Sequence, residues 1–205
     1  MLELRAYAYL DSLQPQFAAL TAALVQGNFP RANDAALYLE VAPGIEVYRL
    51  VDIALKASGV ELGYQMVERE FGMLEFHSAS QSDVLSAGEA ILAAIGKKPE
   101  DALPPYLTAM TIVRRVDPDQ AQIVNRNKAG ALLLPGSTLC VLEVEPAAYA
   151  VVAANEAEKV AAINLIDTWT FGVYGRVFFS GTEAEVKVAA ARIKDLFGWE
   201  GNIEE

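Results

Sequence analysis

Few residues of this chain could carry out chemistry. The single cysteine, Cys140, lies in the apolar stretch TLCVLEV, where a buried thiol is inert, and the single histidine, His77, has no second histidine to complete a metal site. Asp117 and Asp119 flank Pro118, a pattern typical of a turn and a helix start. The sequence also has no phosphate-cradling glycine loop and no nucleophile motif. We therefore predict no enzymatic activity, no bound metal and no cofactor.

A run of three charges, Glu68-Arg69-Glu70, stands out because apolar segments precede and follow it. The segments 63–68 and 72–76 are candidate strands, and the pattern predicts that a turn at Phe71-Gly72 joins them. A solvated turn would explain the charges, and so would a charged loop with a task of its own. The local sequence leaves both explanations open.

Composition excludes several classes of protein. Hydrophobic residues make up 53% of the 205 residues, which is enough for packed cores, and the apolar runs are too short to span a membrane. The net charge of −11 argues against a nucleic-acid partner, because phosphate binding needs a basic face. One cysteine and no signal peptide predict a soluble, cytoplasmic protein with no membrane partner.

The strongest signal in the sequence is an internal repeat at an offset of 103 residues. The offset aligns Pro15 with Pro118, and it aligns the segment LEV at 39–41 with LEV at 142–144. It also aligns Lys56 with Lys159. The repeat predicts a tandem duplication with a first domain at 1–100 and a second at 101–205, joined at the lysine- and proline-rich segment 96–105.

Both repeats predict the same elements. Each has an alternating strand, a short helix near the shared proline, an apolar strand, and a helix with apolar residues at helical spacing (Val47, Leu50, Val51, Ala54 and Leu55 in the first repeat). Two strands joined by a turn and a last helix close each unit. Strands and helices alternate within about 100 residues, which predicts an α/β or α+β fold of two layers.

These stretches resemble a known family. DIALKASGV and NEAEKVAAI, each followed by a strand pair and a helix, are similar to the bacterial microcompartment (BMC) shell domain. Each repeat begins with a strand that ordinary shell domains place last, so both resemble circularly permuted copies with a ferredoxin-like sheet. LELRAYAYLDSLQPQ, DIALKAS, VEREFG and AANEAEKVAAI resemble tandem-domain carboxysome shell proteins. The resemblance leaves open whether the compartment is a carboxysome or a catabolic one.

The resemblance implies a homotrimer that forms a pseudohexameric tile with other shell proteins, with a stacked pair of trimers as a further option. Small polar metabolites would pass through its central pore. Glu68 and Arg69 fall at the family's gate positions. The implied pore lining consists of Glu70, Phe71, Gly72, Phe171, Gly172 and Val173. Because the second-repeat turn has no charge, three charged loops would alternate with three uncharged ones around the pore.

The resemblance also places Lys56 and Lys159 at the tile edge, where the helices of neighbouring tiles meet. Without it, both would be solvated lysines in the last turns of their helices, favourable to the helix dipole. A second function class stays open at this point: a free-standing trimeric sensor that binds a small molecule between subunits. Flat arrays of purified protein would favour the shell tile over the sensor.

Overall fold

A computed structural model describes residues 2–201 and 203 of the chain. The chain divides into two compact units. The first runs to Pro104 and includes Phe171–Val173, and the second contains Pro105–Thr170 and the residues from Tyr174 onward. Among the described residues, no helix is both long enough and apolar enough to cross a membrane.

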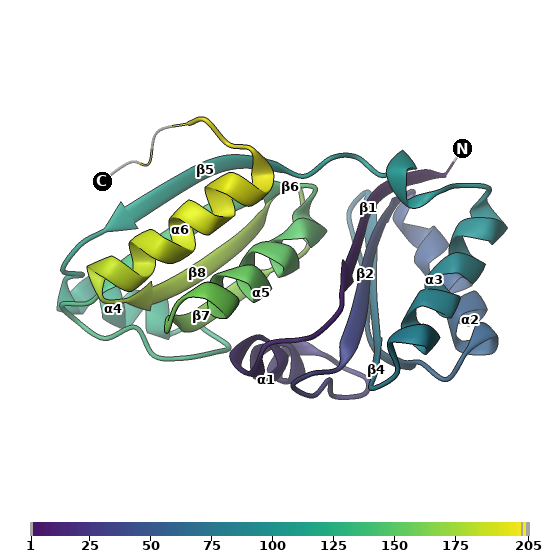
Figure 1. Cartoon of the computed structure of the whole chain (residues 1–205), viewed down its shortest axis with the longest axis horizontal. Helices are drawn as coiled ribbons and strands as arrows, with labels where there is room; N and C mark the ends of the chain where they lie inside the picture. The colour runs from purple at the N-terminus through teal and green to yellow at the C-terminus, as the bar shows by residue number, and fades with distance from the viewer. Residues whose placement is uncertain (1, 202, 204–205) are drawn as a thin grey trace. The chain divides into compact units, whose positions relative to one another are not determined.

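The first unit is built around a four-stranded antiparallel sheet in the order β1-β2-β4-β3 (Figure 1). Its strands are β1 (Glu3–Leu10), β2 (Ala35–Ala42), β3 (Glu61–Glu68) and β4 (Phe71–Ser78). Its helices are α1 (Pro15–Leu24), α2 (Val47–Ala57) and α3 (Gln81–Ile95), with short 3-10 turns at η1 (Gly44–Glu46) and η2 (Pro99–Asp101). Because all strand pairs are antiparallel, the fold is α+β.

Helices cover both faces of this sheet. Helices α2 and α3 lie on one face (Figure 1). There a core cluster joins Leu50 and Ile91 to Leu37, Leu74 and Phe76. The shorter α1 covers part of the other face, and its Phe17 ring packs against Tyr38 of β2. Local signals fix α3: Ser80 accepts a hydrogen bond from the backbone N–H of Asp83, and Gly96 ends the helix in the left-handed conformation.

The second unit repeats this architecture. Its sheet has the order β5-β6-β8-β7, with β5 (Tyr106–Val113), β6 (Thr138–Glu145), β7 (Asn164–Trp169) and β8 (Gly175–Gly181). Its helices are α4 (Pro118–Asn125), α5 (Ala150–Val160) and α6 (Glu183–Phe197), with η3 (Ala147–Tyr149) before α5. Most element starts lie 103 residues after their counterparts, as the sequence repeat predicted. Asp117 caps α4, as its place before Pro118 predicted.

The predicted turn between the paired strands is wrong by two residues. Phe71 and Gly72 are the first residues of β4, and the turn is formed by Arg69 and Glu70. In the second repeat, residues 170–174 form the loop and Gly175 begins β8. The backbone explains the difference, because Arg69 adopts a left-handed conformation (φ 52°) that closes a two-residue hairpin before Phe71.

Candidate functional site: the charged hairpin and the two lysines

The charged hairpin of the first repeat extends into solvent at its tip. The Nε atom of Arg69 lies 3.3 Å from Oε1 of Glu68, and the two side chains are 85% and 34% exposed. The pair is therefore free to exchange its partners with other charged groups. An exposed pair of this kind contributes only about 0.2–1 kcal/mol, so its geometry can change at small cost.

The base of the hairpin is fixed. The backbone N–H of Gly44 donates a 2.8 Å hydrogen bond to the carbonyl of Glu70. Gly72 lies so close to the Gly44 carbonyl that a Cβ atom would overlap it. Gly175 has the same relation to the Ala147 carbonyl in the second repeat. Both glycines are buried and allow a 3-10 turn to pack against the first residues of the strand.

A buried ion pair lies beneath this hairpin. Arg5 Nε of β1 donates a 2.7 Å hydrogen bond to Glu40 of β2, and their side chains are 9% and 2% exposed. The guanidinium also lies 3.8 Å from the centre of the Phe71 ring. Arg5 thus connects the sheet to the first residue after the charged turn. In the second repeat Arg176 pairs with Glu143 at 2.6 Å, from a different strand and with more exposure.

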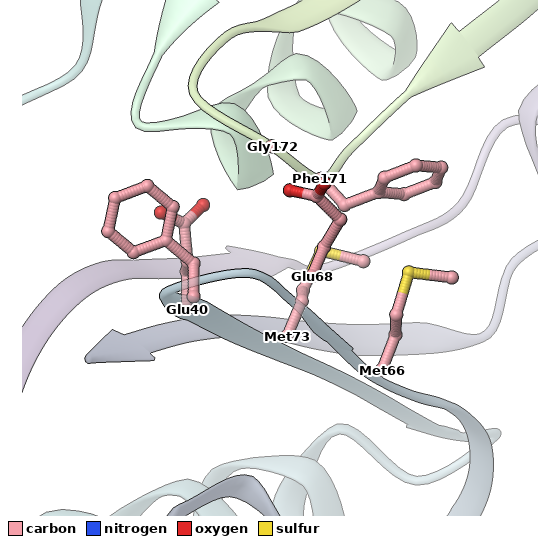
Figure 2. Close-up of a pocket in the computed structure, with 7 residues that line it drawn as sticks. Glu40, Met66, Glu68, Met73, Phe171 and Gly172 are labelled. Carbon is pink, nitrogen blue, oxygen red and sulfur yellow. The ribbon is translucent and has the colours of Figure 1, made fainter. Parts of the chain in front are cut away.

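A small hollow opens on the sheet face next to the hairpin (Figure 2). Its volume of about 10 Å³ is only enough for one water. The hollow is lined by Glu40, Met66, Glu68, Phe71, Met73, Phe171 and Gly172. Two carboxylates and two flexible methionines thus surround a space too small for a metabolite in this chain alone.

The second-repeat loop, residues 170–174, is slim and apolar. Phe171, Val173 and Tyr174 are at least 40% exposed, and Gly172 has a positive φ of 95°. Large apolar side chains at the surface of a folded unit are typical of a contact or passage. The two repeats therefore differ in chemistry at the same place in the fold, with charges on a short hairpin in one and apolar side chains on a longer loop in the other.

The two lysines occupy the last turns of α2 and α5. Lys56 pairs with Asp52 at 2.7 Å, and both side chains are exposed, by 74% and 60%. Lys159 pairs with Glu156 at 2.7 Å and is only 31% exposed. Glu156 also receives hydrogen bonds from Arg192 of α6. Burial alone would raise the pKa of Glu156, but Lys159 and Arg192 together hold it below its usual value.

The residues considered for catalysis belong to different units, with His77 in the first and Cys140 in the second. Cys140 is fully buried in β6, and burial raises the pKa of its thiol far above the usual range. Within the described residues, no group of three or more histidine, cysteine or acidic side chains could hold a metal ion. Two features were not predicted from the sequence, the Arg5–Glu40 pair and a contact between His77 and Glu75. Strand alternation could have found the second, because Glu75 and His77 are two residues apart and share a face of β4.

Comparison with known proteins identifies the relatives of the chain. The family described as the CsoS1D N-terminal domain matches residues 4–101. The carboxysome shell protein CcmP of Synechococcus elongatus is 44% identical over 202 residues, which is 97% of this chain and 95% of that protein. The carboxysome shell protein CsoS1D of Hydrogenovibrio crunogenus is 45% identical over 191 residues, 93% of each chain.

Solved structures agree with these matches. A fused permuted hexameric shell protein of the RMM microcompartment, MSM0275, is 43% identical with a TM-score of 0.92, and the match covers 96% of each chain. A double-ringed trimeric shell protein of the same compartment, MSM0271, is 40% identical with a TM-score of 0.92 over all of both chains. The duplicated α+β fold and the relatives agree in showing that this chain belongs to the family of tandem, permuted microcompartment shell proteins that includes CcmP and CsoS1D.

Proposed function

We propose that the chain is a structural shell protein that assembles as a trimer, and that the trimer forms a six-unit tile around a central pore. Its relatives are named as carboxysome shell proteins, and its structural neighbours as hexameric or double-ringed trimeric shell proteins. Two repeats in one chain require three chains to close a six-unit ring. The role is structural and the compartment supplies any catalysis through other proteins.

We propose further that the Glu68–Arg69 hairpin gates the pore. The observation that supports the gate is the difference between the equivalent turns: three charges at 68–70 and none at 170–174. Alternating charged and uncharged loops would place three charged hairpins between three uncharged loops around the pore. The charged hairpins could meet across the pore axis or retract from it.

The interaction energies of the exposed ion pairs are in the range that a gate requires. Three exposed pairs together favour one conformer by roughly 1–3 kcal/mol, which leaves the other conformer populated at roughly 1 to 15 per cent. A ligand with a modest preference for either conformer would then shift the population. Small polar metabolites are the molecules that such a pore would select.

The test is the pore diameter in structures of wild type, Glu68→Ala and Arg69→Ala. Removing either residue deletes three contacts at once by symmetry, so we expect open pores to predominate by several-fold to about a hundred-fold. Lys187→Ala is a matched control, because Lys187 forms an exposed pair with Glu183 on α6, outside the hairpin. Exchange of the charges, Glu68→Arg with Arg69→Glu, should partly restore closure. Identical closed pores in wild type and both alanine variants would disprove the gate.

A further inference from the structure

A buried acid–base pair lies on the face of the first sheet that α1 covers. The carboxylate of Glu75 lies 2.8 Å from Nδ1 of His77, and the two residues are 0% and 1% exposed. The second oxygen of Glu75 and Nε2 of His77 are buried and have no hydrogen-bond partner among the described residues. Two such atoms in one place are costly, because a buried polar atom normally finds a partner.

Further titratable groups surround the pair from each neighbouring element. Glu61 of β3 lies 3.8 Å from His77 Nε2, and Asp34, just before β2, contributes its negative charge to both members of the pair. Glu75 is paired with Tyr38 of β2 on one side and with Tyr64 of β3 on the other. From α1 the nearest polar group is the hydroxyl of Thr21, which lies 3.4 Å from the Tyr38 hydroxyl and does not titrate.

The chain makes room for the pair at a β-bulge. The register of β3 shifts between Leu62 and Tyr64, so that Gly63 is the extra residue. A Cβ atom on Gly63 would overlap the second carboxylate oxygen of Glu75. Residues 25–34, which we call the strap, are held at the same bulge, since the backbone N–H groups of Gly27 and Asn28 donate to the carbonyls of Gly63 and Leu62.

The second repeat has the same backbone arrangement but carries no charged side chains at the equivalent positions. Its bulge and its strap (residues 128–137) form the same two backbone hydrogen bonds, to Ile166 and Leu165. The positions of Gly63, Glu75 and Tyr38 are occupied by Ile166, Phe178 and Val141, which pack together in an apolar cluster. Serine replaces His77 and Asp34, and asparagine replaces Glu61. The fold therefore does not need the polar pair, and an apolar filling is the ordinary solution.

We propose that the Glu75–His77 pair is a proton-binding site that makes the first strap and α1 sensitive to pH, while the second repeat stays insensitive. When the pair holds its proton, the histidine charge balances the buried carboxylate. When the proton leaves, an uncompensated negative charge remains buried beside Asp34 and Glu61. The strap and α1 then open more often, because opening admits water to that charge.

The directions of the pKa shifts agree with this geometry. Burial alone would lower the pKa of His77, but the hydrogen bond to Glu75 and the charges of Glu75, Asp34 and Glu61 raise it above its usual 6.5. Burial raises the pKa of Glu75, and the contact with His77 only partly offsets this. Both groups thus bind protons more tightly in the folded chain, so stability falls as the pH rises. The His77 contribution is complete below 6.5 and is lost as the pH rises through the folded-state pKa.

Magnetic resonance gives the first test, because His77 is the only histidine in the chain and its Cε1–H group therefore gives one assignable signal. In the assembled wild-type protein we expect that signal to titrate above 6.5, and in Glu75→Gln at a lower pH than in wild type. Glu183→Gln is the control, since Glu183 is an exposed carboxylate of the second repeat. A wild-type His77 pKa at or below 6.5, or an unchanged pKa in Glu75→Gln, would overturn the proposal.

Hydrogen exchange gives the second test, with an internal control in the same molecule. After correction for intrinsic rates, protection of the strap at 25–34 should fall several-fold between about pH 6 and pH 9, because the closed strap holds the proton more tightly than the open strap and loses that stabilisation as the pH rises. Protection of the second strap at 128–137 should stay constant. Glu75→Gln should abolish the difference. Equal pH dependence of the two straps in wild type would refute the proposal even if neither variant folds.

Discussion

At the scale of single residues, the environment rather than the residue type decides what a charge does in this chain. Arg5 and Glu40 are almost fully buried and hold each other, whereas Arg49 and Glu46 form an ion pair that is partly open to solvent. A buried charge left without its partner is costly, while a solvent-exposed pair contributes little. The two pairs therefore allow a matched comparison within one sheet and its helix.

We predict that Arg5→Ala lowers the free energy of unfolding by roughly 3–5 kcal/mol, because the buried carboxylate of Glu40 would lose the guanidinium charge that balances it. Arg49→Ala should change it by less than about 1 kcal/mol. Urea unfolding at equal protomer concentrations measures both, since assembly also contributes to apparent stability. Equal effects of the two substitutions would show that the Arg5–Glu40 pair contributes no more than a surface pair.

At the scale of elements, the repeat predicted the order of strands and helices, because hydrophobic periodicity and shared prolines are local signals. The fold class and the caps of α3 and α4 follow from such signals. The hairpin was misplaced because its turn uses Arg69 in a left-handed conformation, a choice that no glycine marks. The Arg5–Glu40 pair escaped prediction because it joins residues 35 apart, and only the strand register brings them together.

The two hairpin glycines provide a test at this scale. Gly72→Ala and Gly175→Ala should each destabilise their own unit by about 1–3 kcal/mol or more, because the new Cβ would overlap the carbonyl of Gly44 or Ala147. Gly96→Ala is a contrasting control, since open space surrounds Gly96 and the cost there comes only from its positive φ of 65°. Thermal unfolding followed in each variant measures the effect. A Gly72→Ala protein as stable as wild type would mean that η1 can move away from β4.

At the scale of the whole molecule, duplication allows the two repeats of one chain to carry different side chains at equivalent positions. The hairpin turn, the ion pair beneath it, the packing under the strap and the helix lysines all differ between repeats whose backbones correspond. A ring of six identical domains would have to present the same chemistry six times. Three tandem chains can instead alternate two kinds of surface at the pore and at the edge.

We propose that Lys56 and Lys159 lie at the tile edge, and substituting them tests whether the edges alternate. Lys56→Glu with Lys159→Glu should leave the trimer intact and abolish flat arrays, because each substitution replaces a cation with a second carboxylate beside Asp52 or Glu156 and leaves only negative charge at that helix end. Of the single variants, Lys56→Glu should reduce arrays more, since the exposed Lys56 can reach a neighbouring tile while Lys159 is held by Glu156 within its own chain. Sedimentation measures the trimer and electron microscopy the arrays. Lys187→Glu, at an exposed pair on α6, is the control for reversing a surface charge.

Arrays that persist in the double variant would mean that both lysines are only solvated. If arrays are lost in the double variant and reduced equally in each single variant, the edges do not alternate. The difference in exposure between Lys56 and Lys159 would then have no consequence for assembly.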